Sequence, residues 1–197
     1  MLFLALPLLL GAASPPPAPQ KEADEYTLYE LLSPESAQFH ILYEVTATTP
    51  GATLFFNPIR KGSEASGEAV FDAASGGKLA FEQVGGSETV GLSDADPNGA
   101  YIRVHLSRPV PKEGGVRLLI EKTYRDPKSY YREGETIVFS RSLGIKRNAI
   151  LLPQGYEVVS VNIPSQVLVQ GDGRLRVSFL SASPAESPFV LKARRLP

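Results

Sequence analysis

Apolar and polar residues alternate with a period of two along most of the chain beyond residue 26. In the clearest runs, residues 39–45, 102–106, 116–120 and 175–179, every second side chain is apolar and most of the others are polar. Successive side chains of a β-strand point to opposite faces of a sheet. Each run therefore predicts a strand that buries one face and exposes the other.

Shorter segments show the same alternation over four to six residues. They are residues 53–56, 68–73, 79–84, 136–140, 149–152, 157–161, 166–169 and 189–193. Residues 26–32 fit a strand better than a short helix. Nowhere else does a window of a dozen residues show helical spacing without Gly or Pro. The pattern therefore indicates an all-β protein.

Glycine- and proline-rich turns separate the expected strands. Gly171-Asp172-Gly173 predicts a tight hairpin, and Asp96-Pro97-Asn98-Gly99 predicts a turn before residue 101. Residues 111–115 are a further break, and residues 85–98 read as a polar surface loop. About a dozen short strands spaced in this way predict an antiparallel β-sandwich, immunoglobulin-like or related.

The first residues have the pattern of an export signal. An apolar run from Leu2 to Leu10 is followed by small residues, which predicts a signal peptide over residues 1–13 with cleavage after Ala13. No Lys or Arg precedes the run, which is unusual for such a signal. Residues 14–25 predict a proline-rich linker, and residues 26–197 the β-sandwich domain. We prefer one domain, the alternative being two packed lobes that divide near residue 114.

Composition narrows the compartment and the chemistry. The chain has no cysteine, which favours a bacterial exported protein, periplasmic or extracellular, because small exported eukaryotic domains usually carry disulfides. Cysteine nucleophiles and cysteine-bound metals are excluded. The mature chain contains no second apolar stretch long enough to span a membrane.

Charge is distributed unevenly between the two halves of the chain. The net charge is −1, which argues against a nucleic-acid partner. Residues 1–116 carry 7 Lys or Arg and 14 Asp or Glu, whereas residues 117–197 carry 13 and 7. We expect the two halves to attract each other, the alternative being a basic half that faces an anionic partner.

The densest polar segment spans residues 122–132 and contains three tyrosines and four cations, with further basic residues at 141 and 146–147. Tyrosine and arginine are enriched where proteins bind partners. We therefore expect a ligand-binding surface formed by Tyr124, Arg125, Lys128, Tyr130, Tyr131, Arg132 and Arg147. Its partner would be an anionic glycan, a phosphate-bearing ligand or an acidic protein. The alternative is a solvated connection between two strands.

Catalytic and metal-binding signals are weak. Residues 94–99 match the first half of a calcium loop, but position 12 of that loop is His105 where a glutamate is needed. The sequence shows no complete catalytic or metal site and implies no cofactor. It predicts an exported, non-enzymatic binding or assembly module. The alternatives are a purely structural domain or a carbohydrate-active enzyme whose carboxylates meet in space, with candidates at Glu44, Glu82, Glu121 and Glu157.

Overall fold

Fourteen strands and two short 3-10 helices make up the described part of the computed structural model, which covers residues 18–89, 91–182 and 186–197. The all-β prediction is confirmed. The strands are β1 Glu22–Leu31, β2 Gln38–Ala47, β3 Leu54–Ile59, β4 Glu64–Asp72, β5 Phe81–Gly85, β6 Ala100–His105, β7 Val116–Arg125, β8 Tyr130–Glu133, β9 Thr136–Leu143, β10 Arg147–Leu151, β11 Tyr156–Val161, β12 Gln166–Val169, β13 Leu175–Leu180 and β14 Ser187–Arg195. The 3-10 helices are η1 Pro34–Ser36 and η2 Gly86–Glu88.

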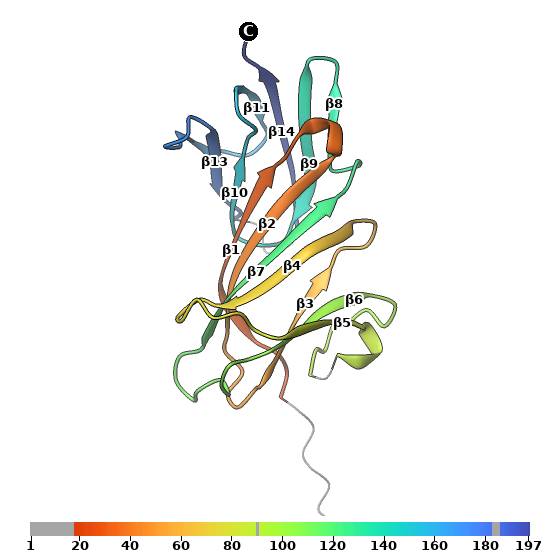
Figure 1. Cartoon of the computed structure of the whole chain (residues 1–197), viewed down its shortest axis with the longest axis vertical. Helices are drawn as coiled ribbons and strands as arrows, with labels where there is room; N and C mark the ends of the chain where they lie inside the picture. The colour runs from red at the N-terminus through yellow and green to blue at the C-terminus, as the bar shows by residue number, and fades with distance from the viewer. Residues whose placement is uncertain (1–17, 90, 183–185) are drawn as a thin grey trace, which may run out of the picture.

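The strands form three sheets that pack as a sandwich (Figure 1). One layer is a seven-stranded sheet in the order β12-β13-β10-β1-β2-β7-β4. A four-stranded sheet, β11-β14-β9-β8, and a three-stranded sheet, β3-β6-β5, lie toward opposite ends of the molecule in Figure 1. One continuous apolar core contains side chains from all three sheets.

The period-two pattern correctly identified the inward face of the longest strand pair. β2 and β7 pair antiparallel over ten residues, from Gln38 opposite Arg125 to Ala47 opposite Val116. Every second residue of both strands is buried. The inward side chains of β2 meet the four-stranded sheet through rings such as Phe39 and Phe139, whose centroids are 5.3 Å apart.

Strands from both sides of residue 114 lie next to each other in the described part of the chain. Within the seven-stranded sheet, β7 lies between β2 and β4. β10 also pairs with β1, and this ladder is parallel, with Tyr26 opposite Arg147. The expected antiparallel β-sandwich is confirmed, and this ladder is a parallel pairing within it.

Ion pairs between the two halves fit their opposite net charges. Carboxylates from the first half meet arginines from the second in the pairs Glu44–Arg117, Glu64–Arg125, Glu35–Arg132, Glu30–Arg174 and Asp24–Arg147. Exposed pairs of this kind contribute between about 0 and 1 kcal/mol each. Their contribution to the stability of the fold is therefore small compared with that of the buried core.

The first described residues are already attached to the sandwich. The Gln20 side chain donates to the Phe56 carbonyl at 3.0 Å and accepts from the Phe56 N–H at 2.8 Å. β1 then begins at Glu22, so the prediction that residues 22–25 belong to a linker is wrong. The expected signal peptide and residues 14–17 lie outside the described residues. Within the described ranges no helix has the length and hydrophobicity to cross a bilayer.

Candidate functional site

Two of the tyrosines expected on a binding surface are core residues. Tyr124 is 2% exposed and Tyr130 is fully buried. The Tyr124 hydroxyl accepts from the Arg60 N–H at 3.1 Å, and the Tyr130 hydroxyl donates to the Leu32 carbonyl at 2.9 Å. A surface that depends on these two rings is therefore not formed.

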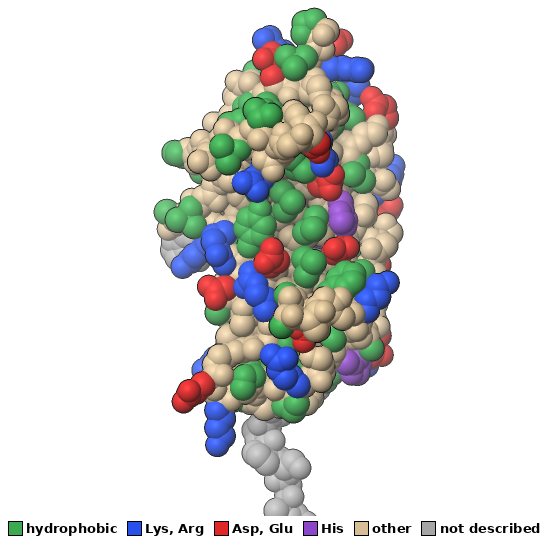
Figure 2. Space-filling model, turned by 60° about the vertical axis from the view of Figure 1, so that its left-hand side comes forward, with side chains coloured by type: hydrophobic (Ala, Val, Ile, Leu, Met, Phe, Trp, Pro, Cys, Tyr) green, Lys and Arg blue, Asp and Glu red, His purple; other side chains and the backbone are tan. Residues whose placement is uncertain are grey.

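The cations expected beside those rings lie on the surface but mostly have partners of their own. Arg125 lies 3.6 Å from Glu64, and Arg132 lies 2.8 Å from Glu35. On the face drawn in Figure 2, Lys and Arg side chains alternate with Asp and Glu side chains instead of forming one basic area. Lys128 is exposed in the turn after β7, and Tyr131 is half-buried on β8.

Arg147 lies apart from the other predicted residues. It is level with Tyr26 near the start of β1, where its Nε donates to the Glu25 carbonyl at 3.1 Å. Arg125 is level with Gln38, at the other end of β2. Six or so strand residues separate the two levels, or about 20 Å. The seven predicted residues therefore do not form one site.

An open cavity of about 550 Å³, lined by both polar and apolar residues, lies where the three sheets meet. β1, β2 and β7 supply one wall, the end of β3 a second, and the end of β9 with the following loop a third. The polar and charged residues that line it are Glu22, Glu25, Thr27, Tyr29, Tyr43, Asn57, Arg60, Lys61, Lys122, Tyr124, Arg141, Ser142 and Glu186.

Lys122 is the most unusual group in this cavity. It occupies an inward position on β7 and is only 5% exposed. Its Nζ donates to Asn57 Oδ1 at 2.6 Å and to the Pro58 carbonyl at 3.3 Å, and lies 5.2 Å from the centre of the Tyr124 ring. No ion pair within the described residues neutralises this ammonium group. Burial, together with the charge of Arg141, lowers the pKa of Lys122 to about 8.

Arg141 lies near the same ring. Its guanidinium carbon lies 5.4 Å from the centres of the Tyr124 and Phe39 rings. Its Nη1 donates to Asp126 Oδ2 at 3.2 Å, so this cation is already paired. Lys122 and Arg141 thus both lie near Tyr124, and among the described residues Arg141 has a carboxylate partner whereas Lys122 has none within ion-pair distance.

The wall built from β1 is acidic. Glu22 stands at the mouth of the cavity, where the residue keeps contact with solvent. Partial desolvation of its carboxyl group and the neighbouring charge of Glu25 raise the pKa of Glu22 to about 7. The Tyr43 hydroxyl, buried on β2, donates to Glu25 Oε1 at 2.6 Å. Burial and these two carboxylates raise the pKa of Tyr43, so its hydroxyl remains a donor.

One polar atom of the cavity wall has no partner. Thr27 is 1% exposed, and within the part of the chain that the structure describes its Oγ1 has no partner at normal hydrogen-bond geometry, the nearby Tyr29 hydroxyl included. Buried hydroxyl groups are normally paired, and leaving one unpaired costs about 1–3 kcal/mol. An unpaired hydroxyl in a polar cavity is what a ligand or ordered water would satisfy.

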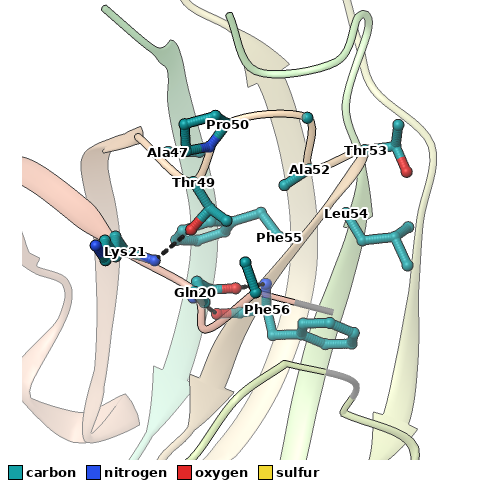
Figure 3. A pocket seen from close by; sticks show the side chains of 12 residues that line it. Gln20, Lys21, Ala47, Thr49, Pro50, Ala52, Thr53, Leu54, Phe55 and Phe56 are labelled. Carbon is teal, nitrogen blue, oxygen red and sulfur yellow. Dashed lines mark hydrogen bonds between the residues drawn. The ribbon is translucent and has the colours of Figure 1, made fainter. Parts of the chain in front are cut away.

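A second cavity, of about 310 Å³, lies beside residues 18–21 (Figure 3). Its walls are mostly apolar, with Pro50, Ala52 and Leu54 among them. Its polar side chains are engaged: Thr49 Oγ1 accepts from the Lys21 N–H at 2.7 Å and donates to the Pro19 carbonyl at 2.9 Å, and Gln20 is paired with Phe56. It therefore offers a ligand less specific recognition than the central cavity.

The weak metal and catalytic candidates gain no support from the geometry. Among the described residues no group of three His, Asp or Glu side chains is placed to hold a metal ion. Asp96, from the partial calcium motif, pairs with Lys61 at 2.5 Å and accepts from the Asn98 N–H. Of the four glutamates considered for glycoside hydrolysis, Glu44, Glu82 and Glu157 are paired with cations, and only Glu44 and Glu121 share a surface depression.

The fold is that of a β-sandwich protein with an open cavity between its sheets. No protein-family model matches the chain, and no curated protein matches it. A structure of similar fold is the crystal structure of an aminopeptidase N family protein from Idiomarina loihiensis, with a TM-score of 0.50 and 9% sequence identity. The match covers 86% of this chain and 29% of that one, so the chain spans less than a third of that protein. At this identity the likeness shows the fold alone.

The position of Lys122 in the central cavity could have been predicted from the period-two pattern of β7. Lys122 continues the inward series Val116, Leu118 and Ile120, and a lysine at such a position must be buried or must interrupt the strand. Glu22 and Glu25 gave no such signal, because the proline-rich composition before them indicated a linker.

Proposed function

We propose that this protein is an exported, non-enzymatic binding module that holds a small anionic ligand in the central cavity. The observation that carries the proposal is the Lys122 ammonium group, buried against the cavity with only neutral oxygen atoms as partners. A buried charge without a counter-ion is costly, and an incoming carboxylate or phosphate would supply the missing partner.

The surroundings of Lys122 fit recognition better than catalysis. Its neighbours are an amide oxygen, a carbonyl and the face of a tyrosine ring, which position the ammonium group. Concave, largely preformed sites with a few convergent polar groups are typical of small-molecule binding. This reading keeps the basic, tyrosine-rich chemistry expected from residues 122–132, but places it inside the sandwich. Export remains a proposal that rests on residues 1–13.

Titration calorimetry with hexanoate and with inorganic phosphate tests the proposal on the purified protein. We expect at least one of these anions to bind, and Lys122→Met to weaken it by about tenfold to a hundredfold, because a charge-assisted hydrogen bond is lost. Lys128→Met is the matched control, since it removes an exposed lysine away from the cavity, and it should leave binding unchanged.

A second variant separates the cavity from the surface. Replacing Arg125, Arg132 and Arg147 together with Ala removes three surface cations whose side chains do not line the cavity. The cavity proposal predicts unchanged anion affinity in this triple variant. If the triple variant loses binding while Lys122→Met retains it, the surface is the site and the cavity proposal is wrong.

A further inference from the structure

β12 forms an open edge of the seven-stranded sheet. It is the last strand of that sheet, and within the described ranges its ladder partner is β13 alone. Apart from Leu196, the large apolar side chains that are exposed in the described chain all lie on β11, β12 and β13: Val159, Val167, Leu168, Val169 and Leu180. Apolar side chains gathered on a surface mark a place where proteins associate.

The outer side of the β12 backbone is free to pair with another strand. Along an antiparallel strand, every second residue exchanges both of its hydrogen bonds with one neighbour, and the residues between direct theirs the other way. The Gln170 N–H donates to the Arg174 carbonyl at 2.8 Å, so Leu168, two residues earlier and level with Arg176, also bonds toward β13. The N–H and C=O groups of Val167 and Val169 therefore point away from the sheet.

The side chains of the same two valines are uncovered as well. Val167 is level with Val177 and Val169 with Leu175, so both valines lie on the inward face of the sheet. Val177 is fully buried, whereas Val167 is 46% and Val169 71% exposed. The second layer of the sandwich therefore does not cover this edge, and an added strand would place its own side chains beside these valines.

β12 also lacks the features that keep other strand edges from pairing. Charged side chains, proline and bulges on an edge strand oppose the addition of a further strand. Residues 158–171 contain no charged side chain, and β12 contains no proline. Each of the other edge strands among the described residues carries such a feature: Glu64 and Glu68 in β4, Pro58 in β3, Glu82 in β5, Arg132 and Glu133 in β8, and Glu157 in β11.

The sequence of this edge is complementary to a second copy of itself. Gln166-Val167-Leu168-Val169-Gln170 reads the same in both directions. Antiparallel pairing about a two-fold axis at Leu168 places Val167 opposite Val169 of the second copy, and both residues direct their backbone groups outward for that contact. Since neither strand is charged, no like charges meet across the axis.

We propose that the chain forms a symmetric dimer in which β12 pairs antiparallel with β12 of a second copy and joins the two seven-stranded sheets. This inference goes beyond the proposed function and is independent of the central cavity. Val167 and Val169 of each copy exchange four main-chain hydrogen bonds, and the two Leu168 side chains meet at the axis. One short strand makes a small interface, so we expect a dissociation constant of about 10–100 µM.

Sedimentation velocity of the full chain over a range of concentrations tests the inference. The protein should sediment as one chain at about 1 µM and mostly as two chains at about 500 µM. Lys122→Met, in the cavity, should not change this behaviour.

A charge exchange at position 168 tests the position of the axis. Leu168→Lys places two ammonium groups opposite each other and Leu168→Glu two carboxylates, so each variant alone should dimerise at least about tenfold more weakly. An equimolar mixture of the two variants should recover dimers, because opposite charges then meet. Ser66→Lys is the matched control, since it adds the same charge to an exposed position of β4, the other edge strand of this sheet, and should leave dimerisation unchanged.

Leu168 is 38% exposed, and circular dichroism spectra that match the parent protein show that each variant is folded. A parent protein that stays monomeric at about 500 µM would overturn the inference. Dimers of Leu168→Lys as stable as those of the parent would place the contact elsewhere, and the inference would be wrong. It would also be wrong if the mixture of the two variants dimerised no better than each variant alone.

Discussion

Arg141 Nη1 lies 3.2 Å from Asp126 Oδ2, and this ion pair is buried at the end of the sandwich nearest the β7–β8 turn. Asp126 does more than pair with the arginine. It also accepts hydrogen bonds from the Lys128 and Ser129 N–H groups and from the hydroxyls of Ser129 and Ser63. A segment that reads as a basic surface loop is therefore folded around one buried carboxylate.

Asp126→Asn should destabilise the protein strongly. Removing one partner of a buried ion pair leaves the other charge uncompensated, which costs about 3–5 kcal/mol. Urea denaturation of the variant at neutral pH measures this loss. Glu64→Gln, which breaks the exposed pair with Arg125, is the comparison and should cost less than about 1 kcal/mol. Equal losses in the two variants would contradict the structural role given to Asp126.

Lys122→Met should have the opposite effect and stabilise the protein at neutral pH. The pKa of Lys122 is lowered from 10.5 to about 8 by burial, so the folded state holds this proton less tightly than the unfolded chain does. The resulting penalty is of the order of 3 kcal/mol. It is fully present below pH 8 and disappears as the pH rises to about 10.5. The stability of the parent protein should therefore rise between pH 8 and pH 10.5, and that of Lys122→Met should not.

Urea denaturation at pH 7 and at pH 10 tests this prediction, with Lys128→Met as the control. A variant that is less stable than the parent protein at pH 7 would show that the hydrogen bonds to Asn57 and Pro58 outweigh desolvation. A gain in stability together with a loss of ligand affinity would show a residue kept for binding at the expense of folding.

The outline of the fold could be read from the sequence because strand burial follows a period of two. The alternating burial of β2 and β7 and the hairpin between β12 and β13 were expected from local pattern and turn residues. The parallel pairing of β1 with β10 was not, since residues 26 and 147 are far apart in the chain and no local pattern encodes which strands become neighbours.

The candidate site was harder to predict because composition does not give side-chain direction. Tyr124 and Arg125 are adjacent in sequence, yet one is buried in the core and the other is exposed on the opposite face of β7. The expectation that the whole segment is exposed is therefore wrong for Tyr124 and Tyr130, which are buried, although Arg125, Lys128 and Arg132 are exposed. Glu22 and Glu25 were also missed, because the alternating pattern becomes recognisable only at residue 26, whereas β1 begins at Glu22.

Asp72 should contribute stability that is lost in acid. This buried carboxylate accepts hydrogen bonds from the Ser107 hydroxyl at 2.5 Å and from the Ala74 N–H at 2.9 Å. The Ser107 hydrogen bond is the main cause that holds its pKa below the ordinary value. The contribution is therefore present above the unfolded-state pKa near 4 and lost as the pH falls through the lower folded-state value.

We expect Asp72→Asn to cost about 2 kcal/mol at pH 7 and to flatten the loss of stability between pH 4 and pH 2. Thermal denaturation followed by circular dichroism across this range measures both effects. Ser107→Ala should reproduce part of the flattening, because it removes the largest cause of the lowered pKa. An unchanged acid dependence in both variants would contradict the assignment.

Gly115→Ala should destabilise the start of β7 through a steric clash. A Cβ atom on Gly115 would lie 2.5 Å from Thr46 Cγ2 and 2.6 Å from the Ala47 carbonyl oxygen, closer than packed atoms allow. Since β7 pairs with both β2 and β4, the strand cannot move away without breaking two ladders. We expect a loss of about 1–3 kcal/mol by urea denaturation.

Gly171→Ala, in the β12–β13 turn, is the control. A Cβ atom there meets no atom within 4 Å, so this variant should change stability by less than about 0.5 kcal/mol. If the two substitutions had equal effects, backbone flexibility and not close packing would explain the glycine at position 115.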